Sequence, residues 1–396
     1  MAAPEDDLDE EEGMTSATPG GSTRTPPART TVAGLGAPLR VGILAPPWVA
    51  VPPPGYGGTE SVLDRLGRGL QAAGHEVRLW TTGDATCPVP RGWTFATSCR
   101  DRMGTSTIEL RHVLEGYEWL TAEGCDVVHD HTLVGPLLAR AALPVITTNH
   151  GPFDDPELTT IYRSTPSTVP IIAISQSQAT TARRLGVHVS HVIHHGIDVE
   201  EVPDGNGLGD AQGRYLMFLG RMDRTKGILR AIEIARSTGS RLIIAAKMTE
   251  PAERHFFECE VAARCVDGIE FVGEVGGSEK YRMLGAASAL LNPIEWPEPF
   301  GLVMVEALAA GTPVITTPHG AAPEIVEHGV TGFVCDDDAA LIRAVRDVST
   351  IDRRRCRAEV DRRFSTALMV HRHLDAYGRL LASTARRRRR AGGAMR

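Results

Sequence analysis

Residues 297–315 read Pro297-Glu298-Pro299-Phe300-Gly301-Leu302-Val303-Met304-Val305-Glu306-Ala307-Leu308-Ala309-Ala310-Gly311-Thr312-Pro313-Val314-Ile315 and predict a loop, a short helix and a strand in succession. Gly311 stands where a helix ends in a left-handed residue, and Thr312-Pro313 prevents its continuation. The helix therefore begins near Gly301, and its free N–H groups can hold a phosphate or a polar sugar face. Glu298 precedes this helix and Glu306 lies within it, so two carboxylates are offered to one ligand.

Length and composition indicate a two-domain cytoplasmic protein. The 396 residues allow two domains of roughly 150 residues plus tails. A net charge of −7, with both signs spread along the chain, argues against a nucleic-acid binder. The seven cysteines never occur in Cys-x-x-Cys spacing, which argues against a disulfide framework and a zinc site. The sequence has no apolar run of spanning length, and its acidic start differs from a secretory signal.

Both ends of the chain are predicted to be disordered tails. Residues 1–37 combine an acidic block with a Thr/Pro/Gly/Ser-rich stretch that cannot bury enough apolar surface to fold. Residues 383–396 contain the basic run Arg386 to Arg390. This run is either a solvated terminus or a contact for anionic lipid or for the acidic tail.

Between the tails, strands and helices alternate in the pattern of open parallel sheets covered by helices. Residues 39–45 form the first predicted strand, and a helix that ends at Gly74 follows. Gly57-Gly58 lies in the loop between them, where the absence of a Cβ atom lets a phosphate approach the backbone. This loop is neither the dinucleotide fingerprint Gly-x-Gly-x-x-Gly nor a P-loop, so hydride transfer and nucleotide hydrolysis lose their main support.

Three further strands, predicted at 126–132, 144–148 and 170–174, bring polar residues to the same sheet edge. The first carries His129 and His131, whose side chains we expect on opposite faces, and the second ends at His150. Each histidine is either a hydrogen-bonded structural residue or a ligand contact.

A second domain is predicted to begin near residue 197. A glycine-rich loop precedes its first strand, residues 215–219, and Gly196 at the crossover is the expected hinge. Arg221 and Lys226 flank the turn after this strand. A guanidinium and an ammonium group at this position suit a diphosphate, because they can neutralise the charge of a departing nucleotide.

The chain resembles retaining glycosyltransferases of the family-4 type over residues 39–381. The resemblance rests on the Glu-x7-Glu spacing of Glu298 and Glu306, on Arg221 with Lys226, and on segments such as 269–276. It implies an α/β protein of the GT-B fold, in which two Rossmann-like doubly wound domains face each other across a cleft. The implied parts are an acceptor domain at 38–196, a nucleotide-sugar domain at 197–364, and a helix at 365–382 that returns to the first domain.

The resemblance also implies a role for each candidate site residue. Glu306 would hold the ribose hydroxyls, Glu298 the donor sugar, and the backbone amides at 300–302 the sugar or phosphate. Residues 273–275 would contact the base. The implied catalytic residues are Glu298, Arg221, Lys226 and His150, and the implied donor-binding residues are Gly57, Gly58, Glu306, Phe300, Gly301, Leu302, Gly273 and Val275.

The implied reaction is retaining transfer of a hexosyl group from a nucleotide diphosphate sugar to a hydroxyl acceptor. UDP-sugars are preferred over GDP- and ADP-sugars, and the acceptor is a sugar, a lipid-linked or a small molecule. The resemblance implies no metal and no organic cofactor. The alternatives are a GT-B epimerase or phosphorylase, which acts on the sugar nucleotide or on a glucan, and a non-catalytic sugar-nucleotide binding protein.

Overall fold

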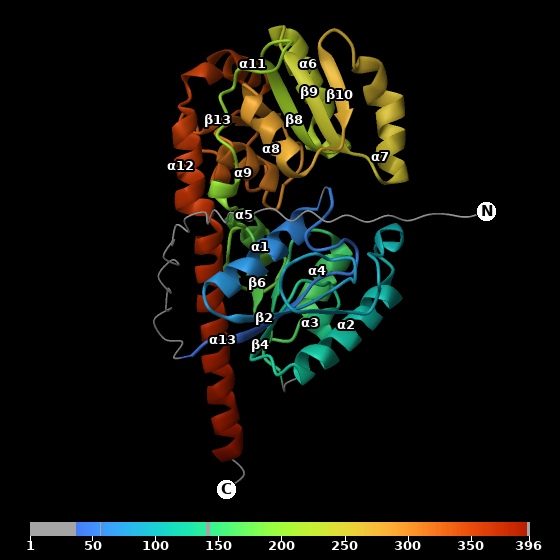
Figure 1. The fold of residues 1–396 in the computed structure, drawn as a ribbon, viewed down its shortest axis with the longest axis vertical. Helices are drawn as coiled ribbons and strands as arrows, with labels where there is room; N and C mark the ends of the chain where they lie inside the picture. The colour runs from blue at the N-terminus through green and yellow to red at the C-terminus, as the bar shows by residue number, and fades with distance from the viewer. Residues whose placement is uncertain (1–36, 56, 140–142, 394–396) are drawn as a thin grey trace, which may run out of the picture. The chain divides into compact units, whose positions relative to one another are not determined.

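A computed structural model describes residues 37–55, 57–139 and 143–393, and Figure 1 shows their arrangement. The predicted disordered tail 1–37 lies almost entirely outside these residues. The first half of the chain forms a parallel sheet in the order β3-β2-β1-β4-β5-β6-β7. Its strands are β1 (Arg40–Leu44), β2 (Glu76–Thr81), β3 (Arg91–Trp93), β4 (Val127–Asp130), β5 (Val145–Thr148), β6 (Ile171–Ala173) and β7 (Val189–Val192).

The second half forms a parallel sheet in the order β10-β9-β8-β11-β12-β13. Its strands are β8 (Tyr215–Arg221), β9 (Arg241–Lys247), β10 (Ile269–Gly273), β11 (Ala289–Asn292), β12 (Val314–Thr316) and β13 (Gly332–Val334). Two parallel Rossmann-like sheets are the predicted architecture, and this prediction is confirmed.

Helices cover both faces of each sheet, as the apolar strands require. In β8, Met217 and Leu219 pack in one core while Leu216 and Phe218 pack in another on the opposite face. The helices of the first half are α1 (Gly58–Ala72), α2 (Ser106–Ala122), α3 (Gly135–Leu138), α4 (Pro156–Ser164) and α5 (Gln176–Arg184). Those that follow are α6 (Ile228–Thr238), α7 (Pro251–Phe256), α8 (Gly277–Ala286), α9 (Leu302–Ala309), α10 (Ala322–Ile325), α11 (Asp338–Asp347), α12 (Arg353–Phe364) and α13 (Thr366–Gly393).

The helix predicted near Gly301 is α9. Gly301 precedes it with a φ of 93°, and Gly311 follows its end with a φ of 74°, both in the left-handed region that favours glycine. The next strand, β12, begins three residues after Gly311. The local prediction of loop, helix, glycine stop and strand is therefore confirmed.

Helix α13 returns the end of the chain to the first half, where it lies beside α1 (Figure 1). Met369, Leu374 and Tyr377 are buried in the same core as strand β1. The helix does not end at 382, and the predicted disorder from 383 onward is wrong as far as Gly393. Arginine and alanine are strong helix formers, so the basic run continues the helix.

The chain crosses between the halves twice, and the two crossings are hydrogen-bonded to each other. Ile197 N donates to Phe364 O at 2.8 Å, and Thr366 N donates to Ile197 O at 3.2 Å. A Cβ atom on Gly196 would lie 2.7 Å from Ser365 O. The predicted boundary near residue 197 therefore lies against the junction between α12 and α13.

Candidate functional site

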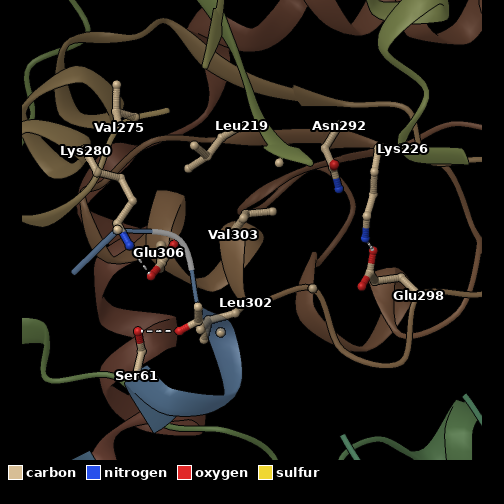
Figure 2. Close-up of a pocket in the computed structure, with 15 residues that line it drawn as sticks. Ser61, Leu219, Lys226, Val275, Lys280, Asn292, Glu298, Leu302, Val303 and Glu306 are labelled. Carbon is tan, nitrogen blue, oxygen red and sulfur yellow. Dashed lines mark hydrogen bonds and ion pairs between the residues drawn. The ribbon is translucent and has the colours of Figure 1, made fainter. Parts of the chain in front are cut away.

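A small pocket collects many of the predicted residues (Figure 2). Its cavity measures about 80 Å³ and is lined by the ends of β8 and β11, by the first half of α9 and by the start of α1. Ligand pockets typically measure 300–1,000 Å³. A nucleotide sugar could therefore enter only if lining groups move apart. The predicted residues that line the pocket are Gly57, Gly58, Lys226, Val275, Glu298, Gly301, Leu302 and Glu306.

Lys226 and Glu298 meet inside the pocket. Lys226 ends the short 3-10 turn after β8, and Glu298 lies on the loop before α9. The Lys226 ammonium contacts the Glu298 carboxylate and lies 4.7 Å from the centre of the Trp296 ring. Trp296 Nε1 donates to the same carboxylate oxygen at 3.0 Å. These contacts place a cation and an anion side by side where a charged ligand could bind.

A second ion pair joins Lys280 and Glu306. Lys280 Nζ lies 2.6 Å from Glu306 Oε1, and the side chains are 18% and 5% exposed. Lys280 comes from the first turns of α8 and Glu306 from the middle of α9, and Figure 2 shows them pointing toward each other. A carboxylate this deeply buried needs a partner. A ligand that binds Glu306 must therefore share or displace Lys280.

The glycine loop contributes the other wall of the pocket. Helix α1 begins at Gly58, and its first residues have no side-chain cap at Gly57. A Cβ atom built on Gly58 would have no neighbour within 4 Å, so the space beside this residue is open. Uncapped N–H groups at a helix start favour an anionic group.

Four predicted residues do not line this pocket: Arg221, Phe300, Gly273 and His150. Arg221 ends β8, and Gly273 ends β10 with a φ of 82°. Phe300 is buried, with its ring centre 5.0 Å from that of His195. His150 lines a neighbouring cavity that shares Gly57 and Gly58 with this pocket.

The histidines at the sheet edge form one row, in which His129 and His131 are buried and His150 is half-buried. His131 Nδ1 lies 2.8 Å from His150 Nε2, and the ring centres of His129 and His131 are 4.0 Å apart. The prediction of opposite faces for His129 and His131 is therefore wrong, because residues i and i+2 of a strand share a face. Burial lowers the pKa of His150 to about 3 and lowers the pKa of His131 well below its usual value. These rings are neutral at physiological pH.

Lys280 and Asn292 are among the pocket residues that were not predicted from the sequence. Asn292 ends β11, a strand that we did not identify because its short run Ala289-Leu290-Leu291 also suits the end of a helix. Lys280 follows the glycine-rich end of β10, and that turn from strand to helix was the available signal. Within the described residues, the structure contains no group of three or more His, Cys, Asp or Glu that could hold a metal ion.

Two family models match the chain. Glycosyltransferase Family 4 matches residues 56–201, and Glycosyl transferases group 1 matches residues 206–363. A phosphatidyl-myo-inositol mannosyltransferase from Propionibacterium freudenreichii is 27% identical over 342 residues, which is 78% of this chain and 85% of that protein.

Solved structures show the same fold. AviGT4, a glycosyltransferase involved in avilamycin A biosynthesis, superposes with a TM-score of 0.68 at 26% identity and covers 87% of this chain and 98% of its own. Anabaena Alr3699/HepE, solved in complex with UDP-glucose, has a TM-score of 0.65 at 16% identity and covers 87% of this chain and 100% of its own. The two parallel sheets therefore form a GT-B fold.

Proposed function

Because the chain belongs to the glycosyltransferases of the family-4 type, we propose that it moves a hexosyl group from a nucleotide diphosphate sugar to a hydroxyl acceptor with retention. The observation that carries this proposal is the pair of lysine–carboxylate contacts within one pocket, Lys226 with Glu298 and Lys280 with Glu306. When the donor binds, each lysine can leave its carboxylate and pair with a donor phosphate. The carboxylate can then accept hydrogen bonds from hydroxyl groups of the donor.

The donor is placed by the residues of α9 and of the turn after β8. Glu306 accepts hydrogen bonds from the ribose hydroxyls, and Glu298 contacts the transferred sugar. Lys226 neutralises the diphosphate. Arg221, at the end of β8, does not line the pocket, so its side chain must turn toward the pocket to contact the diphosphate. The start of α1 at Gly58 faces the phosphates from the other side of the pocket.

Transfer breaks the bond between the anomeric carbon and the diphosphate oxygen, and the acceptor oxygen bonds to the same face of that carbon. The acceptor proton passes to the departing phosphate oxygen. Lys226 favours this step because its charge balances the charge that develops on the leaving group. We propose that no metal or organic cofactor takes part.

The donor base and the location of the protein are further parts of the proposal. We prefer a UDP-sugar, a choice supported by the UDP-glucose complex of the HepE neighbour. No helix in the described part of the chain is both long and apolar enough to cross a bilayer. We place the enzyme in the cytoplasm. The arginines 386–390 at the end of α13 would contact anionic lipid at the inner face of the membrane, where a lipid-linked acceptor would be found.

A thermal-shift screen against UDP-, GDP-, ADP- and TDP-sugars tests the donor. A ligand at a hundred times its Kd adds about 2.7 kcal/mol to stability, so one of the four should raise the Tm. If none does, the proposal is wrong. Transfer to an added acceptor, followed by mass spectrometry, distinguishes a transferase from an epimerase, a phosphorylase or a binding protein.

Substitutions test the assigned roles. Lys226→Gln and Arg221→Ala should each lower turnover about a hundredfold, the scale expected when a positioned charge is lost. Arg224→Gln is the matched control, because Arg224 is exposed and pairs with Glu260. Glu306→Gln should weaken nucleotide binding in calorimetry, whereas Glu298→Gln should lower turnover and leave nucleotide affinity unchanged. The reverse pattern would exchange the two roles.

A further inference from the structure

A second, larger cavity of about 930 Å³ adjoins the donor pocket. The two cavities share Gly57 and Gly58, so a molecule in the larger one lies next to the proposed donor phosphates. Its walls include the aromatic side chains of Trp48 and Tyr162. Its volume is within the range of small-molecule sites.

The carboxylate of Glu60 is buried in the wall of this cavity. It lies in the first turn of α1, lines the cavity and is only 7% exposed. A glutamate in the third position of a helix often caps the helix start, but α1 has no such side-chain cap. The Glu60 carboxylate accepts a hydrogen bond from its own backbone N–H, and no other group among the described residues donates to it.

The other buried carboxylates of the first half all have partners. Asp64 pairs with Arg68 at 2.9 Å, and Glu109 accepts from Leu133 N at 2.6 Å. Asp130 accepts from Tyr117 Oη at 2.6 Å and from the backbone and hydroxyl of Thr132. Glu60 differs from these three, because no other residue in the described part of the chain donates a hydrogen bond to its buried carboxylate, which makes its charged form costly.

The position of Glu60 imposes a cost on the folded protein. Burial raises the pKa of this carboxyl to about 7, even though the charge of Arg100 acts in the opposite direction. A glutamine of the same shape would avoid the cost of a buried charge. A costly polar group of this kind is typical of a functional site.

We propose that Glu60 binds the acceptor, a hydroxyl-rich sugar or cyclitol, by accepting hydrogen bonds from two of its hydroxyl groups. This inference rests on the proposed function and adds the class of acceptor and the residue that holds it. A carboxylate offers two oxygens that accept hydrogen bonds from neighbouring hydroxyls. Trp48 offers an apolar face for the ring of the same molecule. The shared wall at Gly57 and Gly58 brings that molecule next to the proposed donor phosphates, to which the transferred sugar is bonded.

Saturation-transfer NMR tests the proposal on the full chain in the presence of UDP. The probes are myo-inositol, methyl α-D-glucopyranoside and D-glucosamine at high millimolar concentration. Wild-type protein should bind at least one of the two neutral probes, and Glu60→Gln should raise its Kd at least tenfold. Asp101→Asn is the matched control, because it removes an exposed carboxylate from the same cavity and should leave this Kd unchanged.

Several outcomes would overturn the proposal. They are binding of neither neutral probe, binding of D-glucosamine alone, and equal affinity in wild type and Glu60→Gln. Glu60→Asp keeps the charge with a shorter reach and should lie between wild type and Glu60→Gln.

Two control measurements distinguish a failure of this inference from misfolding of the variant and from a failure of the proposed function. At pH 8 the Tm of Glu60→Gln should be equal to or higher than that of wild type, because a buried charge has been removed. Calorimetry with UDP should give the same affinity for both proteins. If UDP binds but Glu60→Gln has no effect on the probes, only the acceptor assignment fails. If no nucleotide binds, the proposed function itself fails.

Discussion

Lys280 and Glu306 depend on each other at the scale of single residues. Their contact distance is 2.6 Å, and both side chains are largely buried. Removal of one partner leaves the other charge buried and unpaired, which typically costs 3–5 kcal/mol. We expect Lys280→Gln to lower the free energy of unfolding by about 3 kcal/mol, and the double variant with Glu306→Gln to recover part of that loss. Urea unfolding of the four proteins in this cycle measures the coupling. Strictly additive losses would show that the contact is unimportant.

The buried histidines make stability depend on pH. Burial lowers the pKa of His150 to about 3 and of His373 to about 4, and also lowers the pKa of His129, His131 and His195. Below a pH of about 6.5 the unfolded chain binds protons that the folded chain does not. Stability should therefore be complete above this pH and fall as the pH decreases.

Each histidine contributes up to about 1.4 kcal/mol per pH unit in this window. Burial raises the pKa values of three carboxyls, Glu60, Glu109 and Asp130. These groups make stability increase as the pH decreases, but they are fewer than the histidines. Urea unfolding between pH 5 and pH 8 measures the slope, and His150→Gln should reduce it. A flat profile would contradict the assignment of neutral imidazoles.

At the scale of elements, a polar contact within an apolar face ties α13 to the first sheet. Tyr377 Oη lies 2.8 Å from His129 Nδ1, and both residues are buried. Tyr377→Phe leaves that nitrogen without a partner, so we expect a loss of about 1–3 kcal/mol in unfolding free energy. His371→Gln, an exposed change on the same helix, is the control. Equal stability of both variants would show that the helix is held by apolar packing alone.

Elements whose signals are local could be predicted from the sequence. Helix α9 was predicted because Gly301, Gly311 and Pro313 fix its ends within a few residues. Lys280 was missed because its partner, Glu306, is brought to it only by the packing of α8 on α9. Strand β11 was missed because its apolar residues are too few to distinguish a strand from a helix end. Contacts between elements far apart in the sequence determine the partner of Lys280 and the conformation of β11, and a local stretch of sequence carries no information about such contacts.

At the scale of the whole molecule, the donor pocket indicates movement. Its cavity of about 80 Å³ is too small for a nucleotide sugar, although Gly57 and Gly58 already line it together with Lys226 and Glu306. We therefore expect the free protein in solution to open around the crossing at Gly196 so that the donor can enter. The halves then close on the donor, and the two lysine–carboxylate pairs separate to make room for it. Small-angle scattering should show a smaller radius of gyration with saturating UDP than without it.

Gly58→Val provides the second measurement of this model. The space beside Gly58 is open, so folding should be unaffected while a side chain blocks the approach of the phosphate. Activity should fall with an unchanged Tm. An unchanged radius of gyration together with an active Gly58→Val variant would rule out both closure and the phosphate role of this loop.

The return of α13 to the first sheet has a consequence for biosynthesis. The ribosome makes the first half of the protein early, yet Met369, Leu374 and Tyr377 complete the core of that half and are made last. Domains made early usually fold while the rest of the chain is still being translated. Here the early half keeps an open apolar groove on the nascent chain until translation is nearly finished. Until then, the first half avoids aggregation only if the second half or a chaperone covers that groove.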